Sequence, residues 1–296
     1  MIMLTNRGRG SSLTYAYISL GVLMQLSAVV VDKSFLQGRT KDAVHRFASQ
    51  HRILMTEALL FEMLTNPQDR RACFAKLPSG ENPVDIVLHR GAYLRKEIST
   101  RRPVPQPSTK IEKLRFQFNE RLLQQDYTLP SGAQAVVDEQ RREVVADAQS
   151  AKSRALQMPS FFPELAARKS HVRRAAREDA EKQVVQPGAL MDFYTNLRAP
   201  KGQRKLPPKR LLTDNWALYR WLQIDFLFCI DLYFRFGSTL SNLLSPASEQ
   251  GIEHDILDAQ YLLVGILEGS FATHETKLQR WYKLILPHGH LFTKDA

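Results

Sequence analysis

Acidic residues recur in this sequence where apolar segments end, and carboxylates placed in that way can assemble into a metal site. The candidates are Asp32, Glu62, Asp258 and Glu275, with Asp255 on the same helix face as Asp258. In an open parallel sheet, sites form at the carboxyl ends of the strands, so we expect these side chains to converge there. Convergent carboxylate oxygens suit Mg²⁺ or Mn²⁺, and such a metal activates water for attack on a phosphodiester. The pattern predicts metal-dependent phosphodiester hydrolysis with Asp32, Glu62 and Asp258 as catalytic residues.

The first two of these acids lie in a segment that alternates strands and helices. The β-branched run Val29–Val31 is typical of a strand buried on both faces of a parallel sheet. A helix over Lys41–Gln50, a strand over Ile53–Met55 and a helix over Glu57–Thr65 follow, the last capped by Thr56. This alternation predicts an α/β fold with a central, mostly parallel sheet.

The C-terminal segment is again apolar and supplies the remaining acids. We expect a core helix over Leu211–Gly237, a loop over Ser238–Gly251, a helix beginning near Glu253, a strand over Ser270–Thr273 and a helix over Lys277–Leu286. Asp255 and Asp258 would then lie in the first turns of a helix. The helix dipole alone also favours acidic residues at that position.

Residues 78–210 differ in composition from both flanking parts. Turn-forming residues gather around Leu77–Gly80 and Arg101–Ser108. Helices are expected over Ile111–Gln125, Gln134–Gln157 and Pro163–Val185, and a basic linker over Ala199–Arg210. Because the two longer helices are Ala-rich and charged, we interpret this segment as a helical insertion.

The overall composition restricts the class of protein. The 296 residues include 41 Lys and Arg against 30 Asp and Glu, and the formal charge of +11 favours a polyanionic partner. A hydrophobic content of 44% excludes a wholly disordered chain. Two isolated cysteines, Cys73 and Cys229, cannot frame a disulfide scaffold or a Cys-rich zinc site, so we expect a cytoplasmic protein.

Two apolar segments resemble membrane spans. The segment Trp216–Phe236 contains four charged residues, each costly at the centre of a bilayer, so we expect a core helix there. The segment Tyr15–Val31 lacks the small-residue cleavage site of a signal peptide. We treat residues 1–23 as an N-terminal extension and expect no stable membrane insertion, with a membrane tether as the open alternative.

Taken in order, the acidic segments resemble the PIN domain family of metal-dependent ribonucleases. The family begins with a hydrophobic strand that ends in Asp and has Ser or Thr within two residues, as in Val31-Asp32-Lys33-Ser34. Its second acid is a Glu in the helix after strand two, which Glu62 matches. Its third is an Asp-Ala pair before a strand ending in Thr-x-Asp, matched by Asp258-Ala259 and Thr273-His274-Glu275. Glu275 departs from the family, which more often has Asp there.

The resemblance covers residues 24–77 and 211–296 and implies a three-layer α/β/α core that is interrupted by residues 78–210. It also implies endonucleolytic cleavage of single-stranded or structured RNA, as by a toxin or a defence effector with an inhibitory protein partner. The alternative is a nonenzymatic scaffold that binds RNA or protein through a degenerate PIN-like fold.

Each candidate residue also has a simpler structural role. Asp32 would cap the following helix, and Glu62 would be a solvated residue on a helix face, with Glu57 competing for its place. His254 and His274 lie beside acidic residues, but their spacing fits no zinc motif, and we expect exposed loop histidines.

Basic residues cluster in two places where RNA phosphates would bind. One cluster is Lys201–Arg210, and the other is Arg168–Arg177, where acidic neighbours favour a solvated helix face instead. Within the core helix, Asp231 and Arg235 are spaced to pair with each other.

Overall fold

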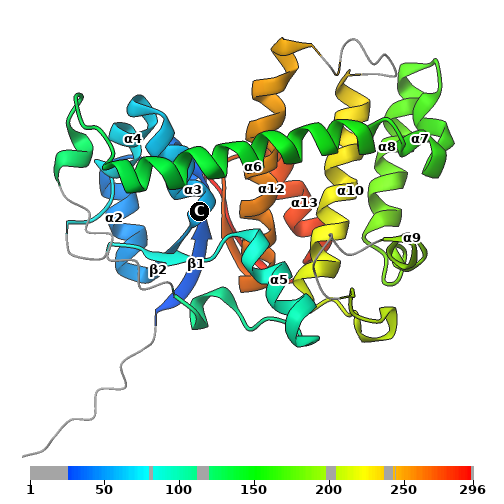
Figure 1. Cartoon of the computed structure of the whole chain (residues 1–296), viewed down its shortest axis with the longest axis horizontal. Helices are drawn as coiled ribbons and strands as arrows, with labels where there is room; N and C mark the ends of the chain where they lie inside the picture. Colours follow the sequence, from blue (N-terminus) through cyan, green and yellow to red (C-terminus); the bar gives the residue numbers. More distant parts are fainter. Residues whose placement is uncertain are drawn as a thin grey trace, which may run out of the picture.

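The computed structural model of the chain contains a five-stranded sheet (Figure 1). Its strands are β1 (Ser27–Val31), β2 (His51–Thr56), β3 (Asp85–Val87), β4 (Ser270–Ala272) and β5 (His290–Phe292), in the spatial order β3-β2-β1-β4-β5. All four pairings are parallel. The structure describes residues 26–79, 83–111, 120–197, 205–236, 243 and 245–294.

Helices form most of the rest of the described chain. They are α1 (Lys33–Gly38), α2 (Lys41–Gln50), α3 (Glu57–Thr65), α4 (Pro67–Phe74), α5 (Arg90–Thr100), α6 (Ser131–Ala155), α7 (Met158–Phe161), α8 (Ser170–Val184), α9 (Met191–Asn196), α10 (Ala217–Phe236), α12 (Pro246–Glu268) and α13 (Thr276–Ile285). The predicted bounds of α2 and α3 are confirmed. Thr40 and Thr56 cap these two helices through their hydroxyl oxygens, which accept from Ala43 N and Leu59 N.

Helices cover both faces of the central strand β1. Successive strand residues point to opposite faces, yet Val29, Val30 and Val31 are all fully buried. The helix α12 packs against β1 and β4, and α2 packs beside β2. The α/β fold with a parallel sheet is thus confirmed, and the arrangement is consistent with three layers.

The order of the strands reverses between β1 and β4. Val31 of β1 is in register with Ala272 of β4, so the residues that follow them, Asp32 and Thr273, leave the sheet side by side. The backbone N of Asp32 still donates to Ala272 O at 3.2 Å. In open α/β sheets, the connections diverge at such a point and leave a crevice at the carboxyl ends of the strands.

The helix α12 begins earlier than the sequence pattern predicts. It starts at Pro246, a residue type that is common at the first helical position, and it ends at Glu268, with Gly269 as the C-cap residue at a φ of 82°. The expected loop over Ser238–Gly251 is therefore wrong in its last part. Asp258 lies well inside α12, beyond the reach of the dipole at its first turn, so that explanation of its position is also wrong.

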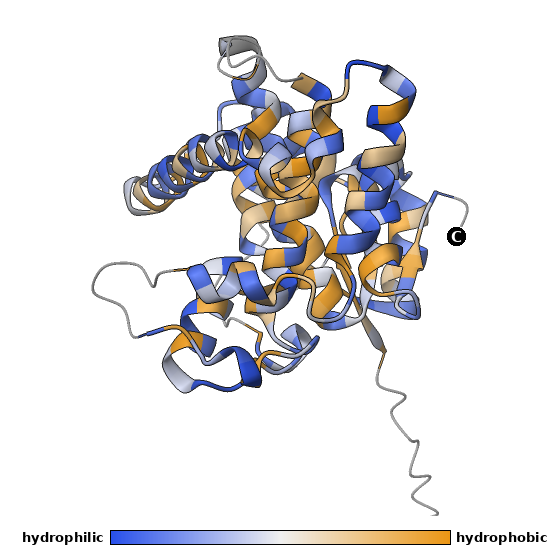
Figure 2. Ribbon diagram, turned by 90° about the vertical axis from the view of Figure 1, so that its right-hand side faces the viewer, coloured by the Kyte–Doolittle hydropathy of each residue, from blue (hydrophilic) through white to orange (hydrophobic). Residues whose placement is uncertain are grey.

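The segment 78–210 contributes more than helices. It contains β3, which pairs with β2, so its helical part begins later than residue 78. Its helices α5, α6 and α8 pack against α10, where hydrophobic residues gather in the middle of the molecule (Figure 2). Three of the predicted segments lie outside the described residues. These are residues 1–23, the first part of the basic linker, and most of the expected helix over Ile111–Gln125.

The charged residues of α10 are paired within the core. Asp231 forms an ion pair with Arg235 Nε at 2.9 Å, as predicted, and a second ion pair with Arg177 Nη2 at 2.9 Å. Asp225 pairs with Arg154 at 2.6 Å. Among the described residues, no helix is both long and apolar enough to cross a membrane.

Candidate functional site

Asp32 lies at the reversal point as the N-cap of α1. Its buried carboxylate accepts from Thr273 Oγ1 at 2.6 Å, from Phe35 N at 2.8 Å and from the hydroxyl of Ser34. Burial raises the pKa of Asp32 to about 6, and the negative charge of nearby Glu275 contributes to this rise. The hydrogen bonds to the carboxylate lower the pKa but do not outweigh the burial. Asp32 is therefore both the N-cap of a helix and a buried acid that groups at the ends of β1 and β4 hold in place.

Glu275 lies at the rim of the site. It is exposed and precedes α13 as its N-cap residue, and its backbone N donates to Thr273 Oγ1 at 3.0 Å. The same turn holds His274 N, which donates to Ser34 Oγ at 2.8 Å. The turn thus ties the end of β4 to the start of α1, while the carboxylate of Glu275 acts on Asp32 only through its charge.

Glu62 is buried in α3 and is held by three donors from α1 and α12, so it is not the solvated helix-face residue of the simpler interpretation. Its carboxylate accepts from Lys33 Nζ, from His254 Nδ1 at 3.0 Å and from Tyr261 OH at 2.6 Å. Burial raises its pKa, but His254 and the Lys33 ammonium outweigh this effect and lower the pKa below its ordinary value. Glu62 is accordingly an ionised carboxylate with its charge compensated.

His254 and Glu57 are also placed by the structure. The backbone around His254 is helical, within α12, so the expected loop position is wrong, although its side chain is exposed. Its contact with Glu62 raises its pKa. Glu57 accepts from the backbone N of His89 at 3.0 Å, and this contact holds the end of β3 rather than the acidic site.

Asp255 is compensated by two cations. It is buried on α12 and accepts from Arg235 of α10 and from Lys277 of α13. These pairs join three helices, so Asp255 has a structural role that its spacing from Asp258 did not indicate.

Asp258 has no such compensation. Among the described residues, no side chain or backbone group donates a hydrogen bond to its carboxylate. Burial raises its pKa well above the ordinary value. The charges of Asp32, Asp255 and Glu62 raise it further, and Lys277 opposes them. Four carboxylates of three elements thus act on one another electrostatically at the carboxyl edge of the sheet, and Asp258 is the one without a donor.

The carboxylates of this site are chemically suited to bind a divalent metal, but their positions in the structure are not those of a metal site. Carboxylate oxygens are the ligands that Mg²⁺ and Mn²⁺ prefer, and a cation next to Asp258 and Asp32 would offset the burial and the repulsion that raise their pKa values. In the described part of the chain, however, no three His, Cys, Asp or Glu side chains are arranged to hold a metal ion. The ammonium groups of Lys33 and Lys277 lie against Glu62 and Asp255 instead.

Sequence reasoning missed Lys33, Lys277 and Tyr261. Lys33 follows Asp32 directly, and Tyr261 lies one turn after Asp258, so their closeness to the acids was available from the spacing. What the spacing did not show is that α3 brings Glu62 against both of them.

A basic hollow lies next to these acids. It has a volume of about 410 Å³ and is lined by Thr276, Lys277 and Arg280 of α13, by Arg174, Arg177 and the acidic Glu178 of α8, and by Phe234 of α10. Of the second predicted cluster, Arg177 is engaged with Glu181 and Asp231.

The fold and site together define an α/β protein with a carboxylate cluster at the reversal point of a parallel sheet. Comparison with known proteins adds nothing to this description, since no family model, no curated protein and no solved structure matches the chain significantly.

Proposed function

We propose that the protein is a metal-dependent endoribonuclease with a PIN-like core, in which Asp32, Glu62 and Asp258 hold Mg²⁺ or Mn²⁺. The observation that carries the proposal is Asp258, an acid placed among three other carboxylates with no donor of its own. Such an arrangement is costly unless a cation compensates it. It also lies at the crevice where open α/β sheets bind their ligands.

The chain's own residues suit this chemistry. A bound divalent metal would activate water and stabilise the leaving oxygen. Ser34 and Thr273 fix both oxygens of Asp32, and Tyr261 fixes Glu62, so the acids are held in place before substrate arrives. The guanidinium group of Arg174 lines the adjoining hollow and would supply charge for a phosphate of a bound strand, whereas Arg280 in the same hollow is paired with Glu181.

The test is cleavage of a mixed-sequence RNA with Mn²⁺ or Mg²⁺, comparing Asp258→Asn and Asp32→Asn with the matched change Asp179→Asn on the exposed face of α8. We expect both site variants to lose at least 100-fold in rate, and Asp179→Asn to keep the parent rate. Circular dichroism and thermal melting establish that the variants are folded. Unchanged cleavage by Asp258→Asn contradicts the proposal.

One observation favours the alternative of a nonenzymatic scaffold that binds RNA. Lys33 and Lys277 already neutralise Glu62 and Asp255, and a fold that needs no metal would be stabilised in this way. The two functions differ in turnover, because a scaffold retains intact RNA when metal is added, whereas a nuclease consumes it.

A further inference from the structure

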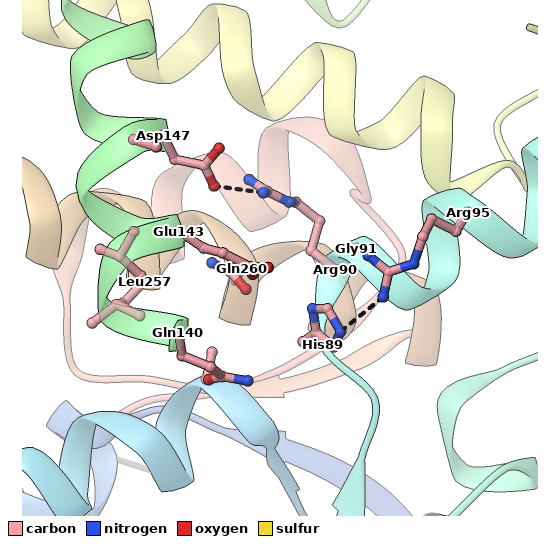
Figure 3. A pocket seen from close by; sticks show the side chains of 12 residues that line it. His89, Arg90, Gly91, Arg95, Gln140, Glu143, Asp147, Leu257 and Gln260 are labelled. Atoms are coloured by element: carbon pink, nitrogen blue, oxygen red, sulfur yellow. Dashed lines mark hydrogen bonds and ion pairs between the residues drawn. The ribbon is translucent and has the colours of Figure 1, made fainter. Parts of the chain in front are cut away.

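A second cavity opens beside the acidic site (Figure 3). Its volume is about 250 Å³, and its walls come from α3, α5, α6 and α12. This is below the range of about 300–1,000 Å³ that is typical of pockets for drug-sized ligands. A single flat ring system matches such a space better than a whole nucleotide does.

A largely buried glutamine of α12 presents its amide to the cavity. Gln260 of α12 is 8% exposed, its side chain lines the cavity, and no described group forms a hydrogen bond with it (Figure 3). Its amide atoms are accessible from the cavity, because they are not among the buried polar atoms of the described residues that lack a hydrogen-bond partner. The amide is therefore available to donate to and accept from a ligand in the cavity.

A carboxylate without a hydrogen-bond partner among the described residues also lines the cavity. Glu143 of α6 lines the same cavity, and among the described residues it forms neither a hydrogen bond nor an ion pair. The two arginines nearby are engaged. Arg90 pairs with Asp147 at 2.5 Å and stacks on Trp221, and Arg95 contacts His89 Nε2 at 3.3 Å. Among the described residues, the free groups that line the cavity are thus the amides of Gln140 and Gln260 and the carboxylate of Glu143, which suit a neutral ligand rich in N–H donors more than a phosphate.

A glycine keeps the wall of the cavity open. A Cβ atom at Gly91 would lie 2.9 Å from His89 Cε1 and 3.0 Å from Arg95 Nη1, so any side chain there would push both groups aside. The imidazole of His89 and the guanidinium of Arg95 are flat groups, of the kind on which an unstacked base rests.

The cavity and the acidic site share two walls. On α3, Ala58 faces the cavity and Glu62 faces the acids, about one helical turn apart. On α12, Leu257 and Gln260 face the cavity, while the next residue after each, Asp258 and Tyr261, belongs to the acidic site. A strand bound at the acids would therefore have a neighbouring base within reach of the cavity.

We propose that this cavity binds an unstacked nucleobase, and guanine in preference to adenine. The N1–H and N2–H groups of guanine lie side by side and can both donate to the Glu143 carboxylate, while the Gln260 amide pairs with a further edge of the base. Adenine presents the acceptor N1 at the same place, which a carboxylate repels. The choice of RNA as the source of the base rests on the proposed function, but recognition of the base does not.

Binding of GMP and AMP to the full chain, measured by calorimetry in EDTA, tests this proposal. We expect GMP to bind at least tenfold more tightly than AMP, and Glu143→Gln and Gln260→Ala to weaken GMP binding about tenfold each. The control is Glu139→Gln, the same change at an exposed position one turn earlier on α6. Glu143 is exposed on the helix surface, so its substitution leaves the fold intact even where Gln260→Ala does not.

The outcomes separate this inference from the proposed function, because binding is measured without metal. Equal affinity for GMP and AMP, absence of GMP binding, or no loss in Glu143→Gln overturns the base pocket even if the protein cleaves RNA. Selective GMP binding that Glu143→Gln weakens supports the pocket even if no RNA is cleaved. A guanine-containing pentanucleotide that binds more tightly than GMP identifies RNA as the source of the base, and equal binding identifies the free nucleotide.

Discussion

The Lys33 side chain provides the sharpest test of what the acidic site does. Its ammonium donates to Glu62, and both side chains are mostly buried, with 19% and 7% of their surface exposed. A metal that uses Glu62 as a ligand must displace this ammonium. Substitution Lys33→Met removes the charge and keeps most of the apolar stem.

The expected magnitude follows from the contacts of Glu62. A hydrogen bond to a charged group contributes about 1.5–3 kcal/mol. We take the lower end, since His254 and Tyr261 continue to hold the carboxylate. About 1.4 kcal/mol corresponds to a factor of ten in affinity. Lys33→Met is therefore expected to bind Mn²⁺ about tenfold more tightly than the parent and to unfold at a lower urea concentration without metal.

The assay is calorimetric titration with Mn²⁺, supported by urea unfolding with and without the ion. The control is Lys41→Met, the same change at an exposed lysine at the start of α2. Equal or weaker Mn²⁺ affinity in Lys33→Met refutes the reasoning that Lys33 and a metal compete for Glu62. Such a result favours the scaffold, in which Lys33 is the permanent counterion.

Three further predictions concern the fold that positions the site. Glu97 accepts from three buried backbone N–H groups, among them Ala217 N and Leu218 N at 2.8 Å, so Glu97→Ala is expected to lower the free energy of unfolding by about 3–5 kcal/mol in urea denaturation; a loss below about 1 kcal/mol contradicts this. Burial raises the pKa of Asp32 from 3.8 to about 6, so the folded protein binds this proton more tightly than the unfolded chain. The unfolding free energy of the parent relative to Asp32→Asn should then fall by about 2.4 kcal/mol between pH 4 and pH 7, and a difference independent of pH refutes it. A Cβ atom at Gly265 would lie 2.7 Å from the ring of Phe271, so Gly265→Ala is expected to cost about 1–3 kcal/mol in thermal unfolding, and an unchanged melting temperature would show that β4 and α12 can move apart.

Local patterns in the sequence predicted the elements that hold the first two acids. The buried run Val29–Val31 and the capping residue Thr56 are signals that act over a few residues, and the structure follows them. The early start of α12 escaped prediction because Pro246 was read as a loop residue, although it is also suited to a first helical turn. The burial of Glu62 could not be predicted for a different reason. It depends on the packing of α12 against α3, which is a contact between segments far apart in the sequence.

The charge balance of the site could not be predicted from acidic positions alone. Asp255 and Asp258 share one helix face, but Arg235 of α10 and Lys277 of α13 both reach Asp255. Both cations are about 20 residues from Asp255 in the sequence, and this spacing does not predict that they pair with it. The difference in charge compensation between two neighbouring acids is therefore a property of the tertiary structure.

The length of α12 explains how one helix can serve two sites. Because it begins at Pro246, Asp258 and Gln260 lie in its middle, where backbone hydrogen bonds on both sides hold them rigidly. Adjacent residues of a helix point about 100° apart, so Asp258 faces the sheet edge while Leu257 and Gln260 face the second cavity. A helix that began near Glu253, as the sequence pattern predicts, would place these residues within about two turns of its N-terminus, nearer to the end that frays. The fixed angle between the two faces is what would hold a base at a constant distance from the bond to be cleaved.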